Sequence, residues 1–171
     1  MVDIAPFEAI RYRREAVTSF ANVIAPPYDV ISPALHDELY ARDAHNIGRV
    51  DLNRMEPSDG ELSRYKRAAS IFGAWLRDGI LAKDATAAYY VLSQTFTGPD
   101  GVERTRTGFF GSALLTRFSD GPILPHERTL AGPKVDRLHL FRATRTNLSP
   151  IFGMYADPDR RLATILATTA N

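Results

Sequence analysis

Apolar positions recur along this chain with two different periods, and these periods divide it into predicted helices and strands. The clearest helical stripe repeats every three or four residues and consists of Leu62, Tyr65, Ala69, Phe72 and Leu76. Ser58 and Glu61 form a capping-box pattern before it, and Gly79 marks its end. Because a stripe with this period is normally buried, we interpret Tyr65, Phe72 and Trp75 as core rather than as an aromatic ligand site.

The clearest pair of strands covers residues 87–97 and 102–118. They are joined by Gly98, Pro99, Asp100 and Gly101, a turn sequence that favours a β-hairpin. Glu103, Arg104 and Arg106 are interpreted as outward-facing charges of the return strand. The sequence therefore predicts one antiparallel hairpin in the middle of the chain.

The other elements follow from capping residues and from shorter apolar runs. Strands are predicted over residues 4–12, 46–52 and 149–155. Helices are predicted from the N-cap Ser32 to about residue 42, over 133–146, and over 159–169 after Asp157. This order predicts an α+β fold, a mixed and mostly antiparallel sheet with flanking helices, in one domain over residues 1–171.

The helix expected at 133–146 has a poor period. Val135, Leu138 and Phe141 share one side, and Leu140 lies away from it. Two basic residues lie near the same side, Lys134 and Arg145. The mixture suggests that basic residues of this helix face a cleft or another part of the protein.

Composition narrows the class of protein but does not identify a ligand. Hydrophobic residues make up 44% of the chain and charged residues 24%, which is typical of a globular domain. Cysteine is absent, the formal net charge is +1, and neither a secretory leader nor a spanning apolar run is present. We therefore expect a cytoplasmic protein without a membrane or nucleic-acid partner, and no particular cofactor is indicated.

The segment 121–153 concentrates groups that handle protons and phosphates. His126 and Glu127 are the candidate acid and base, and a turn is needed to bring both to one pocket. The candidate ligands for an anionic substrate are Arg128, Thr129, Lys134 and Arg137. This pattern favours binding of a nucleotide or another phosphorylated small molecule.

A second candidate segment precedes the helix at Ser32. Pro26 and Pro27 fix two backbone angles, so the chain is extended and rigid where it reaches Tyr28 and Asp29. Such rigidity suits a substrate-binding position, and it equally suits a connection into the next helix. Tyr28 and Asp29 are therefore added to the candidate substrate-binding residues.

The alternative interpretation of the same charges is structural. Glu127, Arg128, Asp136 and Arg137 can form an ion-pair network that fixes the loop against the helix. In that case the chain is a non-catalytic regulatory or interaction domain. A metal site is not indicated, because the histidines and acids of this segment lack a familiar ligand spacing.

Several segments resemble landmarks of one known family. They are PPYDVIS at 26–32, HNIGRVDL at 45–52, YKRAASIFGAWLRDGIL from residue 65, GFFG at 108–111, PHERTLAGPKVDRL from residue 125, and NLSPIFGMY from residue 147. Together they resemble the bacterial and archaeal family called domain of unknown function 1015, over nearly the whole chain.

The resemblance has implications for partners and activity. Members of the family are about twice as long, and their later half carries a Gly-His-His-Arg motif similar to that of ParB-like and sulfiredoxin-like proteins, some of which are serine kinases. This motif does not occur here. The resemblance thus implies that the chain is the N-terminal part of a longer protein, with the C-terminal half as its partner.

Overall fold

The computed structural model describes residues 2–126 and 131–169. These residues group into two compact units. The helical unit comprises residues 10–83 and 131–151, and the hairpin unit comprises residues 2–9, 84–126 and 152–169. Helices and small antiparallel sheets confirm the predicted α+β class. That the chain folds as one domain stays a prediction.

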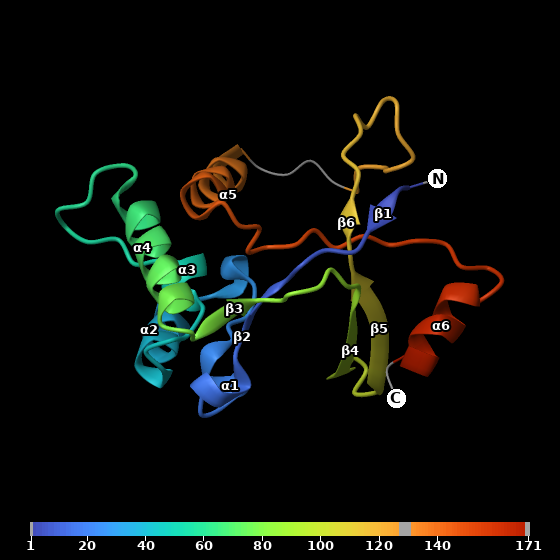
Figure 1. The fold of residues 1–171 in the computed structure, drawn as a ribbon, viewed down its shortest axis with the longest axis horizontal. Coiled ribbons are helices and arrows are strands. Elements are labelled where there is room, and N and C mark those ends of the chain that lie inside the picture. Colours follow the sequence, from blue (N-terminus) through green and yellow to red (C-terminus); the bar gives the residue numbers. More distant parts are fainter. Residues whose placement is uncertain (1, 127–130, 170–171) are drawn as a thin grey trace. The chain divides into compact units, whose positions relative to one another are not determined.

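The helical unit contains five α-helices and one small sheet among the described residues (Figure 1). The helices are α1 (Phe20–Val23), α2 (Pro33–Arg42), α3 (Gly48–Asp51), α4 (Ser63–Arg77) and α5 (Ala131–Thr144). Strand β2 (Ile10–Tyr12) pairs antiparallel with β3 (Leu81–Lys83), and two short 3-10 turns cover Arg14–Ala16 and Tyr28–Val30. The N-cap predicted for α2 is confirmed, because the Ser32 hydroxyl accepts a hydrogen bond from the Leu35 amide at 3.2 Å.

Helix α4 supplies most of the core of this unit. The buried cluster consists of Val50, Tyr65, Ala68, Phe72, Trp75, Leu81 and Leu140. This confirms the interpretation of the aromatic stripe as core. The capping box at Ser58 is wrong, because Leu62 is the N-cap residue and no side chain caps the helix. Gly79 follows the helix with φ of 72°, a backbone angle that favours glycine.

Residues 46–52 contain helix α3 rather than the predicted strand. The side chain of Asn46 is completely buried and donates to the carbonyls of Asn22 at 2.7 Å and Ile24 at 3.0 Å. Its Oδ1 atom accepts from the Gly48 amide at 2.9 Å. These bonds fix the chain at the start of α3. Ile47 and Val50 are three residues apart, a spacing that places both side chains on one face of a helical turn but on opposite faces of a strand.

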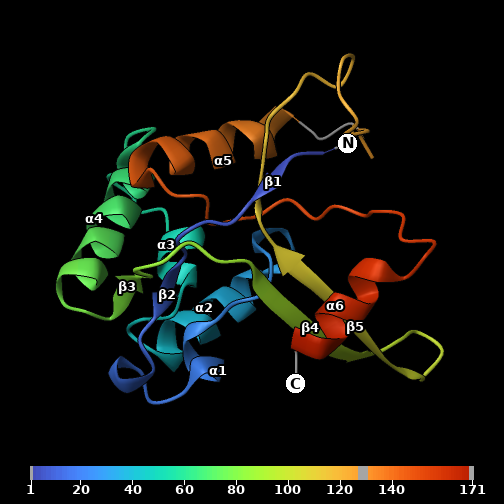
Figure 2. The same cartoon turned by 45° about the vertical axis from the view of Figure 1, so that its right-hand side comes forward.

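The hairpin unit is built on the predicted hairpin, which is confirmed (Figure 2). Strand β4 (Tyr90–Thr97) pairs antiparallel with β5 (Glu103–Phe110), and Gly101 in the turn has φ of 77°. Strand β1 (Ile4–Ala5) pairs with β6 (Ser112–Ala113), and helix α6 (Arg161–Thr169) packs on β5. The Asp157 carboxylate accepts from the amides of Leu162 and Ala163, which confirms it as a cap.

The buried strand predicted over residues 149–155 is wrong. These residues form no regular structure, and the side chains of Ile151 and Met154 are 93% and 81% exposed. An apolar run becomes a buried strand only if a neighbouring strand accepts its backbone hydrogen bonds. The return strand of the hairpin likewise ends at Phe110 rather than at residue 118. Within the described residues, no helix is both long and apolar enough to span a bilayer.

Candidate functional site

The guanidinium of Arg137, on α5, is the centre of a polar cluster in the helical unit. Its Nη1 donates to Asp51 Oδ1 at 2.7 Å, and its Nη2 donates to the Asp51 carbonyl at 2.9 Å and to Asp136 Oδ2 at 2.6 Å. The guanidinium carbon lies 3.9 Å from the centre of the Tyr28 ring. Arg137 therefore joins the end of α3 to α5 while stacking on Tyr28.

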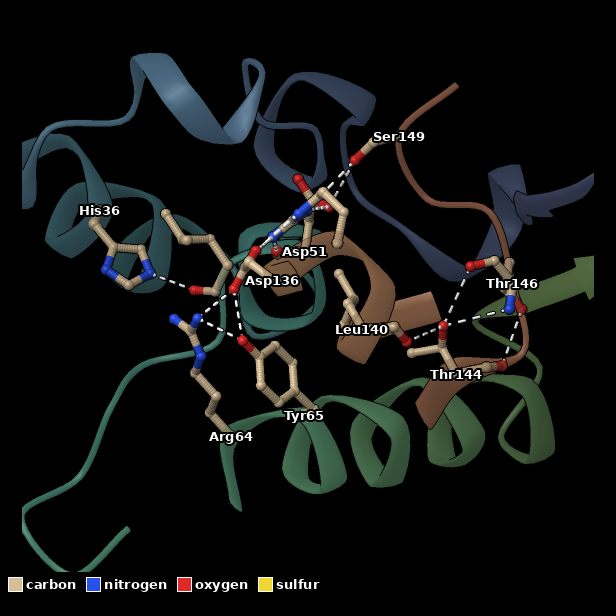
Figure 3. A network of polar contacts seen from close by, with 11 residues as sticks. His36, Asp51, Arg64, Tyr65, Asp136, Leu140, Thr144, Thr146 and Ser149 are labelled. Atoms are coloured by element: carbon tan, nitrogen blue, oxygen red, sulfur yellow. Dashed lines mark hydrogen bonds and ion pairs between the residues drawn. The ribbon is translucent and has the colours of Figure 1, made fainter. Parts of the chain in front are cut away.

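Asp136 connects the same cluster to α4. Its Oδ1 accepts from the Tyr65 hydroxyl at 2.7 Å and is paired with the Arg64 guanidinium (Figure 3). We call Asp51, Arg64, Tyr65, Asp136, Arg137 and Ser149 the Arg137 network. Its two guanidiniums and two carboxylates balance in charge. The charged side chains of the network are all less than 30% exposed, so water weakens these contacts less than at an open surface.

The two carboxylates of the network differ in acidity. Burial raises the pKa of Asp51, and the positive charge of Arg137 opposes this effect without cancelling it. Burial also acts to raise the pKa of Asp136, but the Tyr65 hydroxyl and the guanidiniums of Arg137 and Arg64 outweigh it, so its pKa is lowered. Asp51 is therefore the network carboxylate that accepts a proton more readily.

Ser149 is held beside Asp51. Its hydroxyl donates to Asp51 Oδ1 at 3.2 Å and accepts a longer bond of 3.4 Å from Arg137 Nη1 (Figure 3). A carboxylate with a raised pKa can accept the proton of a hydroxyl group that lies beside it. The same contacts also pair three partly buried polar groups, the Asp51 carboxylate, the Ser149 hydroxyl and the Arg137 guanidinium, with one another.

The space around the network is small. A cavity of about 10 Å³ lies between α3, α4 and α5, and its lining includes Asp51, Tyr65 and Arg137. A second cavity of about 60 Å³ is lined by residues that include Arg137, Asn147 and Ser149. Binding pockets for drug-sized ligands have volumes of roughly 300–1,000 Å³. These two cavities therefore have room for water molecules or a very small ion, and not for a nucleotide.

The structure brings together only some of the residues predicted as a site. Tyr28 and Arg137 are in contact, whereas Asp29 and Lys134 are exposed and outside the network. His126 is exposed in the hairpin unit. Glu127, Arg128 and Thr129 lie outside the described residues, so their predicted roles stay predictions. In the described part of the chain, no group of three potential metal ligands comes together.

The predicted ion-pair network is described only in part, because Glu127 and Arg128 lie outside the described residues and their pairing stays a prediction. Asp136 and Arg137 pair with each other as predicted, and Asp51 and Arg64 are further partners that the sequence did not indicate. Both were missed because Asp51 lay in a predicted strand and Arg64 on the polar side of a predicted helix. The pairs join positions 72 and 86 residues apart, a separation at which local spacing carries no information.

Comparisons with known proteins agree with the resemblance in the sequence motifs. No curated protein and no solved structure matches the chain. The family described as "Protein of unknown function (DUF1015)" matches residues 4–171, which is nearly all of the chain. The link to ParB-like proteins stays a prediction. On the extent of that match, the chain belongs to the DUF1015 family.

Proposed function

We propose that this chain is a non-catalytic regulatory or interaction domain in which the Arg137 network has a structural role. The observation that carries the proposal is the pairing of Arg137. Its guanidinium contacts two carboxylates and an aromatic ring, so its charge is already balanced before any ligand arrives. A phosphate clamp needs cations that are free to contact the phosphate oxygens. The network instead holds α3, α4 and α5 together.

The hairpin unit supports an interaction role, because it presents large apolar side chains to solvent. Leu115 is 90% exposed, Leu124 82%, Met154 81% and Phe152 70%. Apolar surface of this kind on a folded domain is typical of a protein interaction site. We propose that its occupant is the C-terminal half that the family resemblance implies, because a permanent partner in the same polypeptide would keep these side chains out of water.

The proposal is tested by expressing this chain and the C-terminal half of a full-length family member as separate polypeptides. We expect them to form a complex on size-exclusion chromatography. The variant Leu115→Ser/Met154→Ser should weaken the complex at least tenfold, as measured by isothermal titration calorimetry. Val30→Ser is the matched control, because Val30 is also exposed, at 62%, but lies in the helical unit. Equal affinity of both variants would contradict the proposal.

A phosphorylated ligand is the second candidate function, and one observation favours it. The Ser149 hydroxyl and Arg137 both line the cavity of about 60 Å³, and Asp51, with its raised pKa, holds that hydroxyl. Titration of the chain with ATP, ADP and inorganic phosphate tests this function. Binding that is lost in Ser149→Ala and Arg137→Lys, both with wild-type circular dichroism spectra, would favour it over the interaction domain. Absence of heat with all three ligands would exclude it.

A further inference from the structure

Helix α5 exposes the apolar stripe that its sequence would place in a core. Val135 is 52% exposed, Leu138 43% and Phe141 50%, whereas Leu140 on the opposite side is only 4% exposed. The buried side of the helix is set by Leu140 and by the contacts of Asp136 and Arg137. The poor apolar period of this helix therefore reflects two different faces, one in the core and one in solvent.

The exposed face of α5 is also basic. Lys134 and Arg142 are exposed on the helix, and exposed Arg145 follows its last residue. At about 100° per residue, Lys134 and Arg142 share an arc of about 120° with the three apolar residues, and Arg145, with φ of 55°, follows at the end of the helix. Of the carboxylates that the structure describes, none pairs with these three cations. We call this set, Lys134, Val135, Leu138, Phe141, Arg142 and Arg145, the outer face of α5.

Contacts on the inner side of α5 hold the whole helix in place. Asp136 and Arg137 fix α5 against α3 and α4, and Leu140 packs into the core cluster. A helix that is held in this way presents its outer side chains in a fixed arrangement, which lowers the conformational entropy lost when a partner binds. The outer face is thus a preorganised surface of apolar and positively charged groups.

We propose that the outer face of α5 binds an acidic amphipathic segment of a partner protein. Apolar side chains of that segment contact Val135, Leu138 and Phe141. Its carboxylates pair with Lys134 and Arg142. The partner's chemistry follows from charge complementarity. A second copy of this face is disfavoured, because it would place like charges opposite one another. A membrane surface is disfavoured as well, because the cations lie among the apolar residues rather than on a separate polar face, and insertion would desolvate them.

This inference extends the proposed interaction function to a second surface, and it rests on that function only in treating the Arg137 network as structural. The outer face lies in the helical unit, whereas the surface proposed for the C-terminal half lies in the hairpin unit. If the two halves form their complex but no acidic amphipathic peptide binds at α5, this inference alone is overturned. Binding of phosphate or ATP through Arg137 would overturn the proposed function instead.

The test uses a fluorescent peptide with Leu and Glu at helical spacing, together with a scrambled peptide of the same composition. We expect fluorescence anisotropy to detect binding of the first peptide at least tenfold more tightly than the second, with an affinity that falls as salt rises. Lys134→Glu/Arg142→Glu and Phe141→Ser should each weaken binding at least tenfold. Lys66→Glu/Lys83→Glu is the charge control and should change the affinity less than twofold.

Three results would overturn the proposal. The first is equal binding of the ordered and scrambled peptides. The second is binding to phosphatidylglycerol vesicles without binding to the peptide. The third is dimerisation of the chain that becomes stronger in the variant Lys134→Glu/Arg142→Glu. Circular dichroism and thermal unfolding of every variant establish that the fold is intact. If Phe141→Ser unfolds, Leu138→Ser takes its place, because Leu138 is similarly exposed.

Discussion

The Arg137 guanidinium lies 2.7 Å from the carboxylate of Asp51, a residue 86 positions earlier in the chain. This ion pair fixes α5 to the end of α3, and the two side chains are only 20% and 13% exposed. Removing one partner of a buried pair leaves the other charge without compensation. The pair therefore matters for stability mainly because breaking it leaves one charged side chain without its partner.

We expect Arg137→Met to lower the free energy of unfolding by about 2–4 kcal/mol, because Asp51 would then be a buried carboxylate without its cation. Urea denaturation followed by circular dichroism measures this change. Arg142→Met is the matched control: Arg142 lies on the same helix but is exposed, and its replacement should change stability by less than about 0.5 kcal/mol. The double variant Asp51→Asn/Arg137→Met should recover part of the loss. Equal effects of the two single variants would show that the network does not stabilise the fold.

The two carboxylates of the network should give opposite pH dependences. The pKa of Asp51 is raised in the folded state, so its contribution to the free energy of unfolding falls as pH rises from the usual value of 3.8 to the raised pKa. The pKa of Asp136 is lowered, so its contribution is complete above 3.8 and is lost as pH falls towards the lowered pKa.

Urea denaturation of the wild type, Asp51→Asn and Asp136→Asn between pH 3 and pH 7 checks these signs. As pH rises, the stability of the wild type relative to Asp51→Asn should decrease, and its stability relative to Asp136→Asn should increase. Since both variants remove one negative charge, general charge effects are matched. Two differences that change in the same direction would contradict the assigned pKa shifts.

The elements that were predictable from the sequence are those defined by local chemistry. Ser32 is an N-cap beside a proline, and the Gly98 to Gly101 turn joins two strands of matching length, so short-range bonds determine both structures. The candidate site was less predictable. Arg137 was recognised as a cation of α5, but its balancing carboxylate Asp51 belongs to a segment predicted as a strand. Long-range ion pairs decide whether an arginine is free for a ligand, and local sequence patterns do not predict such pairs.

The apolar runs were the least predictable part. Residues 149–155 and the stripe on α5 have the composition of core segments, yet Ile151, Leu138 and Phe141 are exposed. Hydrophobicity predicts that a side chain will be buried by something, but it does not specify what. If the proposed partners bind these surfaces, the patterns describe a larger assembly than the chain alone.

Asn46 is a second position where a polar group should control stability. We expect Asn46→Ala to lower the free energy of unfolding by about 2–3 kcal/mol, because it leaves the Asn22 and Ile24 carbonyls and the Gly48 amide without their partner. Asn46→Asp should be at least as damaging, since a carboxylate cannot donate to the two carbonyls. Urea denaturation measures both. Asn147→Ala, at an exposed asparagine, is the control, and a comparable loss there would remove the special role of Asn46.

Two glycines at and after α4 should respond in opposite directions to the same substitution. Gly79 has φ of 72°, so Gly79→Ala should cost about 1 kcal/mol of stability, because an L-residue is strained in the left-handed region. Gly73 lies inside α4, where alanine favours the helix by about 0.5–1 kcal/mol. A Cβ at Gly73 would lie 3.3 Å from Nη1 of Arg77, at the flexible end of a side chain that can move away. Thermal unfolding should therefore show a lower Tm for Gly79→Ala and a higher Tm for Gly73→Ala. A lower Tm for both would mean that contacts of α4, rather than backbone conformation, decide the outcome at Gly73.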